Sequence, residues 1–269
     1  MKSKIIAIVF AICLFSQGAG AQGILAEADS AYAAGKYESA VELYQRAAEE
    51  EGTSAPLLYN LGNACFQTGD YGNAMLSWLR ARRLAPGDET IQANINYLQS
   101  RVEDANKAEQ KGKRYKVVPD EPSFFQSVKG ALADDISSDT WAVWAAVAFI
   151  VFVAAAALYI FSRTVILRKT GFFGGMVSLL FSLVFVIFAF MAANAADSHD
   201  TGVVTAFKVT LLTEPGKDAD ANKGGVLTKG TVVQILSEEV DAEGKTTWYK
   251  VRMNTDYIGW VAASDMAVV

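Results

Sequence analysis

The sequence holds little of the chemistry on which enzymes depend. Its 269 residues include one histidine, two cysteines and five prolines. A Cys-His or Ser-His catalytic set would need His199, because the sequence contains no other histidine. Three residues as near in sequence as Asp197, His199 and Asp200, on a short exposed segment, rarely form a closed metal site. We therefore expect no catalytic residues, no metal and no cofactor.

Cysteine and basic clusters are scarce as well. Cys13 belongs to a segment that we expect to be removed, so the mature chain keeps Cys65 alone and cannot form an internal disulfide. Its position in a helix predicts that Cys65 is a buried structural thiol, with a redox-active thiol as the alternative. The net charge is −5 and no clustered basic face is present, so nucleic acid is not an expected partner. No phosphate-binding glycine loop occurs either.

Charge is absent from two long apolar runs, at residues 141–161 and 172–196. About 20 apolar residues in a helix span a bilayer, so each run is long enough to cross one. The connecting residues 162–171 carry Arg163, Arg168 and Lys169 and no acid. The positive-inside rule therefore places this loop in the cytoplasm and both flanking segments outside it. With no ionisable residue in either run, the hairpin is interpreted as an anchor in the lipid bilayer.

Residues 1–21 have the pattern of a secretory signal peptide. Lys2 and Lys4 precede a short apolar run, and Ala19-Gly20-Ala21 matches a cleavage site. An uncleaved anchor is the alternative. The signal peptide would independently support the export of both flanking segments.

An internal repeat occupies residues 22–108. The segments 33–47 and 67–81 align at an offset of 34 residues, which pairs Tyr44 with Trp78 and places small residues at equivalent positions. This pattern resembles the tetratricopeptide repeat, a helix-turn-helix unit. We expect repeats at about 21–54 and 55–88, followed by a capping helix at 89–108.

The resemblance implies a concave groove that binds a peptide or a protein segment. Its groove positions fall on Tyr59, Asn60, Asn63, Phe66, Gln67 and Asn94. Amide side chains along a groove can hold an extended backbone by paired hydrogen bonds, which favours the three asparagines. Tyr59 and Phe66 are equally consistent with packing between helices.

The remaining segments are a linker and a predicted small all-β domain. Residues 109–140 suit an extended linker, in which a helix after Pro122 would rest on the membrane surface or pack on a partner. Residues 201–269 hold short β-rich runs separated by turn-forming residues. The turn Lys229-Gly230-Thr231 and the closing Gly259-Trp260-Val261 resemble the bacterial Src-homology-3-like (SH3-like) barrel.

The aromatic residues of the barrel have two interpretations. Trp248, Tyr249 and Tyr257 are candidates for a ligand-binding surface. Half or more of the aromatic residues in so small a barrel would instead belong to its core, and we expect Trp260 to be a core residue. In the family that it resembles, the barrel binds peptides, cell-wall fragments or another protein domain.

The expected fold class is therefore a multidomain membrane protein, with α-helical tetratricopeptide repeats, a two-helix transmembrane hairpin and a small all-β SH3-like barrel. This order resembles the E-type component of the Bacteroides aerotolerance (Bat) family. The resemblance implies a bacterial inner-membrane protein with both soluble domains in the periplasm, a role in tolerance of oxygen or envelope stress, and partnership with von Willebrand factor A-type membrane proteins and a MoxR-class ATPase.

Three functions remain open from the residues themselves. The favoured one is a non-enzymatic scaffold that presents two binding modules to partner proteins. The second is a membrane protein that senses or binds peptidoglycan. The third is an enzyme or redox carrier that depends on Cys65.

Overall fold

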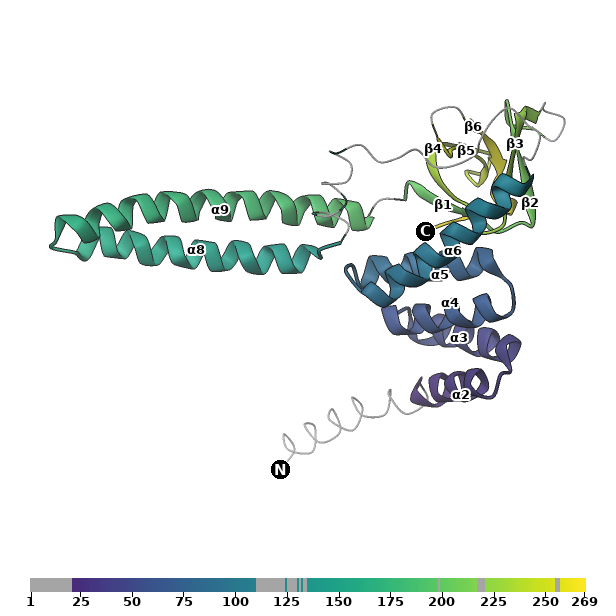
Figure 1. Ribbon diagram of the computed structural model, residues 1–269, viewed down its shortest axis with the longest axis horizontal. Coiled ribbons are helices and arrows are strands. Elements are labelled where there is room, and N and C mark those ends of the chain that lie inside the picture. The colour runs from purple at the N-terminus through teal and green to yellow at the C-terminus, as the bar shows by residue number, and fades with distance from the viewer. Residues whose placement is uncertain are drawn as a thin grey trace. The chain divides into compact units, whose positions relative to one another are not determined.

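The computed structural model describes residues 21–109, 124, 130, 132, 135–197, 199–216, 221–254 and 257–269. These residues form two compact units. The first unit combines helices from the N-terminal part of the chain with strands from its C-terminal part, and the second contains the two long apolar helices (Figure 1). The predicted signal peptide, except Ala21, and most of the predicted linker with its surface helix lie outside the described residues.

Five helices form the repeat region of the first unit, and they stack one upon the next (Figure 1). They are α2 (Ala21–Ala33), α3 (Tyr37–Glu51), α4 (Ala55–Gln67), α5 (Tyr71–Leu84) and α6 (Glu89–Glu109). Ser54 caps α4 by accepting a hydrogen bond from the backbone N–H of Leu57 at 3.3 Å, and Pro56 occupies its first turn. The expected tetratricopeptide-like helical region is confirmed.

Small residues bring the paired helices close together. Ala40, Ala47, Ala74 and Ala81 are completely buried. Gly62 on α4 lies against the indole of Trp78 on α5, where an added Cβ would come within 2.5 Å of the ring. A larger residue at position 62 would therefore force the two helices apart, because interiors at this density leave no spare volume.

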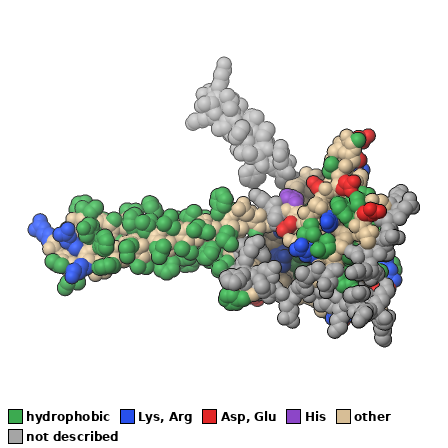
Figure 2. Space-filling view, turned by 90° about the horizontal axis from the view of Figure 1, so that it is seen from above, with side chains coloured by type: hydrophobic (Ala, Val, Ile, Leu, Met, Phe, Trp, Pro, Cys, Tyr) green, Lys and Arg blue, Asp and Glu red, His purple; other side chains and the backbone are tan. Residues whose placement is uncertain are grey.

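The second unit contains α8 (Ser138–Phe161) and α9 (Val165–Asp197). Both are candidate membrane spans, over Ser138–Phe161 and Val165–Ala195. Hydrophobic side chains cover the length of this hairpin, and Lys and Arg side chains gather at its joined end (Figure 2). Every backbone N–H and C=O that crosses a bilayer needs an internal partner, and a helix provides one.

The connection between the two helices is shorter than the predicted loop over residues 162–171. It consists of Ser162–Thr164, so Arg163 alone of the three predicted topology-setting residues lies in it. Arg168 and Lys169 lie in the first turns of α9, where the Arg168 N–H donates to the Thr164 carbonyl. No proline interrupts residues 165–197, so α9 begins close to the hairpin tip, at Val165.

Two serines join the helices of the hairpin. The Ser178 hydroxyl donates to the carbonyl of Ala148 at 2.6 Å, and the Ser182 hydroxyl donates to the carbonyl of Ala145 at 3.0 Å. Both bonds run from α9 to α8. Small polar residues at such a contact allow close approach and add interhelical hydrogen bonds in an apolar medium.

The C-terminal domain of the first unit is a curled antiparallel sheet of seven strands. Their order in the sheet is β3-β2-β6-β5-β4-β1-β7. The strands are β1 (Thr201–Val204), β2 (Lys208–Leu212), β3 (Ala221–Thr228), β4 (Val232–Val240), β5 (Thr246–Arg252), β6 (Ile258–Ala262) and β7 (Met266–Val268), with a short 3-10 helix, η2 (Ala263–Asp265), before the last. The expected SH3-like barrel is confirmed.

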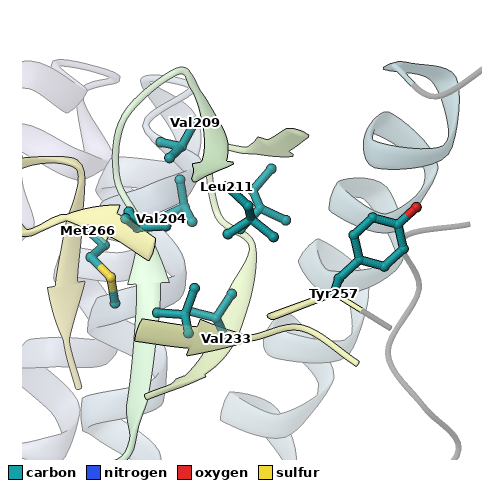
Figure 3. Packing of buried hydrophobic residues seen from close by; sticks show 9 residues of the cluster. Val204, Val209, Leu211, Val233, Tyr257 and Met266 are labelled. Carbon is teal, nitrogen blue, oxygen red and sulfur yellow. The ribbon is translucent and has the colours of Figure 1, made fainter. Parts of the chain in front are cut away.

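The barrel encloses a single apolar core. Val204, Val209, Leu211, Val233 and Met266 project into it from four strands, β1, β2, β4 and β7 (Figure 3). Strand alternation places every second residue on this inner face, so Val209 and Leu211 are buried while Lys208 and Thr210 are exposed.

Candidate functional site

One side chain, Asn63, lies at the centre of the predicted groove in the second repeat. Its Oδ1 accepts a hydrogen bond from Trp78 Nε1 at 3.2 Å and another from Asn94 Nδ2 at 3.0 Å. The Trp78 N–H also lies 3.2 Å from the main-chain oxygen of Tyr59. Asn63 thus joins α4, α5 and α6, and two of the three predicted groove asparagines are in direct contact.

The first repeat contains the same arrangement, displaced by one repeat. Asp29 Oδ1 accepts from the Tyr44 hydroxyl at 2.5 Å and from Asn60 Nδ2 at 3.3 Å. Asp29, Tyr44 and Asn60 each precede their counterparts Asn63, Trp78 and Asn94 by 34 residues. The repeat is therefore preserved in its hydrogen bonds as well as in its helices, with a carboxylate in one unit and an amide in the other.

A pocket of about 160 Å³ opens between these two sets of residues. It is lined by Asp29, Tyr32, Tyr44, Asn60 and Asn63. Burial and the hydrogen bond to Asp29 both raise the pKa of Tyr44, so its hydroxyl stays protonated and donates to the carboxylate at neutral pH. The pocket thus presents a carboxylate, amides and aromatic rings to whatever enters it.

Phe66 lies in an aromatic cluster beyond the asparagines. Its ring centroid is 5.5 Å from that of Tyr71, 5.8 Å from Trp78 and 5.9 Å from Tyr97. The Arg101 guanidinium lies 5.3 Å from the Tyr71 centroid and 5.9 Å from those of Phe66 and Tyr97. Phe66 is only partly buried and Tyr97 is 55% exposed, so the cluster packs the helices and also presents an aromatic surface.

The other predicted groove residues are placed as follows. Tyr59 and Asn60 are partly buried on α4, and Gln67 is exposed at the last position of that helix. Asn60 and Asn63 line the pocket, whereas Asn94 reaches it through Asn63. Asp29 is not among the predicted groove residues, although the 34-residue offset of the repeats, extended backward along the chain, pairs it with Asn63.

The barrel aromatics differ from expectation. Tyr257, predicted as a surface residue, is 5% exposed and belongs to the core, and Trp260, expected in the core, is only partly buried. The strand register explains the exchange: Trp260 pairs with Lys250 across β5 and β6, on the face opposite to buried Val251 and Val261. The Lys250 ammonium lies 5.9 Å from the Trp260 ring centroid.

Trp248 lies on the same outer face as Trp260. It pairs with Ala262, two residues along each strand from the Lys250–Trp260 pair, and it is partly buried. Tyr249 pairs with Val261 on the inner face and packs against the core. Of the three predicted surface residues, Trp248 therefore remains a candidate for ligand binding. Trp260, on the same outer face, is a second candidate.

The barrel contacts the repeat helices through Asn106 of α6. This side chain is completely buried. Its Oδ1 accepts from the backbone N–H and the hydroxyl of Thr228, both at 2.9 Å, and its Nδ2 donates to Thr231 Oγ1 at 3.0 Å. The Asn106 side-chain oxygen thus accepts two hydrogen bonds and one of its two side-chain N–H groups donates a third, all at the turn between β3 and β4.

An ion pair and a close approach between two backbone segments also join the barrel to the repeat helices. Lys229 Nζ lies 3.0 Å from Asp70 Oδ1, at the start of α5. Gly230 has a positive φ of 88°, and an added Cβ would lie 3.1 Å from the carbonyl oxygen of Tyr71. Glycine at this position therefore provides the turn conformation and also the space for α5.

The structure also shows the exposure of His199 and Cys65, the two residues considered above for catalysis or redox chemistry. His199 is exposed. Cys65 is 1% exposed. Within the part of the chain that the structure describes, no three or more His, Cys, Asp or Glu side chains are grouped so as to hold a metal ion.

Comparison with protein families identifies both soluble domains. Residues 25–89 match the model for the tetratricopeptide repeat, and residues 211–267 match the model for the bacterial SH3 domain. A search of curated proteins found no match to the chain. The chain therefore combines two domain types that are associated with binding to protein or to peptidoglycan, together with two apolar helices that suggest membrane anchoring.

Proposed function

We propose that this chain is a membrane-anchored scaffold whose repeat groove holds a segment of a partner protein. The observation that carries the proposal is the pocket between Asp29, Asn60 and Asn63 on the first helices of the two repeats. An extended peptide offers alternating N–H and C=O groups, and amide side chains at fixed spacing can pair with both. The proposal assigns no catalytic residue and no cofactor.

The hairpin would hold this binding region at the inner membrane with both soluble domains in the periplasm. Arg163, Arg168 and Lys169 at the joined end of α8 and α9 support a cytoplasmic tip. The resemblance of residues 1–21 to a signal peptide and the match to a bacterial SH3 domain support the same placement. Anchoring would raise the effective concentration of the groove around other membrane proteins.

The order of domains further supports membership of a Bat-type complex. On this proposal the partners are membrane proteins with von Willebrand factor A-type domains and a MoxR-class ATPase, and the complex acts in tolerance of oxygen or envelope stress.

The test is a quantitative affinity purification of the tagged full-length chain from native membranes. The groove variant combines Asn60→Ala with Tyr97→Ala, because neither side chain is fully buried. The matched control combines Gln45→Ala with Glu49→Ala, two exposed residues of α3. We expect proteins with von Willebrand factor A-type domains to be recovered with the parent and the control, and to be reduced at least roughly fivefold with the groove variant, as for the loss of about 1 kcal/mol.

Equal recovery by the groove variant and the parent would show that the groove is not the docking site. Loss from the control as well as from the groove variant would indicate a general defect instead, which circular dichroism of both purified variants would reveal.

Peptidoglycan is the second candidate ligand, because Trp248 and Trp260 flank Lys250 on the outer face of the barrel. If no protein is recovered with any form, co-sedimentation of the full-length protein with purified sacculi becomes the decisive measurement. Sedimentation that is lost in a Trp248→Ala, Trp260→Ala double variant would favour a wall-binding function.

A further inference from the structure

The two repeats differ in charge at one equivalent position. Asp29 accepts from Tyr44 and Asn60 with one carboxylate oxygen, and Asn63 accepts from Trp78 and Asn94 with its single amide oxygen. In the second repeat an amide therefore accepts from the two equivalent donors, Trp78 and Asn94. Since a neutral side chain suffices for this helix contact, the charge of Asp29 is not required by the fold.

The second oxygen of Asp29 remains available. Across the described part of the chain, no hydrogen bond involves Asp29 Oδ2 and no ion pair involves Asp29. The Asp29 side chain is exposed and lines the pocket together with Tyr32. The ring of Tyr32 packs edge-on against that of Tyr37, with 5.3 Å between the two ring centroids. A cation that entered the pocket would thus meet a carboxylate oxygen without displacing an existing partner.

The two helices of the first repeat also carry an excess of acidic residues. Helices α2 and α3 with their connecting turn carry two basic residues, Lys36 and Arg46, and Arg46 is engaged by Glu50 at 3.0 Å. The acidic residues of the same segment are more numerous, namely Glu27, Asp29, Glu38, Glu42, Glu49, Glu50 and Glu51. Such an excess attracts a cationic ligand and disfavours an anionic one.

We propose that the first repeat holds a cation subsite, in which Asp29 receives a lysine or arginine side chain of the bound protein segment. This inference rests on the proposed function and specifies its ligand. Asp29 Oδ2 accepts from the ammonium or guanidinium group, Tyr32 lines the path of the side chain, and Asn60 and Asn63 remain for the backbone of the segment. A carboxylate at the end of a peptide would be repelled from this position.

The experiment uses the full-length chain in nanodiscs of neutral lipid, which present no charge of their own. Phage-displayed random peptides are selected in parallel on the parent and on two variants, Asp29→Asn and Asn63→Asp. Asp29→Asn gives the first repeat the amide already present in the second, so it keeps an acceptor for Tyr44 and Asn60 and removes the charge. Asn63→Asp places the charge in the second repeat.

We expect peptides selected on the parent to be enriched in lysine or arginine at one position, and peptides selected on Asp29→Asn to lack this enrichment. Selected arginine peptides are then compared with their citrulline counterparts, which keep the shape and lose the charge. The parent should prefer arginine by roughly two- to fivefold, the range for an exposed ion pair, and Asp29→Asn should bind both alike. Raising the salt concentration should reduce the preference of the parent.

Peptides that bind the parent without any enrichment in basic residues would overturn the cation subsite and leave the groove as a peptide-binding site. The same enrichment on Asp29→Asn as on the parent would also overturn it. Failure to select any peptide on the parent would overturn both the subsite and the proposed function. A second basic position gained with Asn63→Asp would support the subsite.

Discussion

At the scale of single residues, burial decides what Cys65 can do. The side chain is 1% exposed within the helix pair of the second repeat, and burial, with a smaller effect of the Asp70 carboxylate, raises its pKa to about 12. The thiolate is the reactive form of cysteine, so almost none is present at neutral pH. This environment favours the interpretation of Cys65 as a structural thiol.

We accordingly predict that Cys65 in the native protein resists alkylation by iodoacetamide at neutral pH, by at least roughly a hundredfold relative to an exposed cysteine of ordinary pKa. Mass spectrometry of the peptide that contains Cys65 measures the extent of alkylation over time. The same peptide from denaturant-unfolded protein, which should react fully, is the control. Rapid alkylation of the folded protein would instead support the redox alternative.

At the scale of elements, the pairing of α4 with α5 depends on one indole. The Trp78 N–H donates to the Asn63 side chain and to the Tyr59 main chain, and the Trp78 ring covers Gly62. The 34-residue offset in the sequence predicted that Trp78 and Tyr44 are equivalent. It did not predict that both donate a hydrogen bond to the same position of the preceding helix, because the offset contains no information on side-chain direction.

We predict that Trp78→Phe lowers the free energy of unfolding by about 1–3 kcal/mol, because it removes the donor to two partly buried acceptors, on Asn63 and Tyr59, and reduces the volume of a buried ring. Tyr44→Phe removes only the hydroxyl that donates to Asp29 and should cost about 1 kcal/mol. Urea unfolding of both variants, followed by circular dichroism of the full chain in detergent, measures the difference. An unchanged stability in Trp78→Phe would contradict the structural role of the indole.

At the scale of the first unit, the barrel and the repeats are parts of one compact body. The turn between β3 and β4 is held by Asn106 of α6 and by Asp70 at the start of α5. A tetratricopeptide array must cover the apolar face of its last helix, and here Val102 of α6 is buried beside Gly230 of the barrel. The barrel thus completes the covering that a third repeat would otherwise provide.

This contact should depend on pH through Asp70. Burial alone would raise the pKa of Asp70, but hydrogen bonds from Asn73 and Lys229 and the Lys229 charge lower it below its usual value of 3.8. A carboxyl with a lowered pKa in the folded state contributes stability above its unfolded-state pKa, and this contribution is lost as the pH falls through the folded-state value.

We therefore predict that Asp70→Asn is less stable than the parent at neutral pH by about 0.5–1 kcal/mol, and that the difference narrows at acid pH as the pH falls through the lowered pKa of Asp70. Asp104→Asn, whose carboxylate is exposed and paired with Lys107 at 3.5 Å, is the control and should change little at either pH. Urea unfolding at the two pH values provides the measurement. An Asp70→Asn difference that persists in acid would show that the helix start, and not the charge, is responsible.

The sequence by itself determined the local elements of this protein. The 34-residue period specified the repeat helices, the length of uncharged sequence specified the candidate spans, and alternating β-rich runs with their turns specified the barrel. Each of these signals is contained within a few tens of residues, because helix and strand periodicity and the cost of burying charge act locally. The buried state of Cys65 followed from the same periodicity.

Only the tertiary structure decided which residues meet across these elements. The exchange of Tyr257 and Trp260 depends on the register between β5 and β6, the charged pocket depends on Asp29 and Asn60 meeting across α2 and α4, and the buried bonds of Asn106 join residues more than 120 positions apart. Register and long-range contacts arise from packing the whole chain into a dense interior, so no local pattern encodes them.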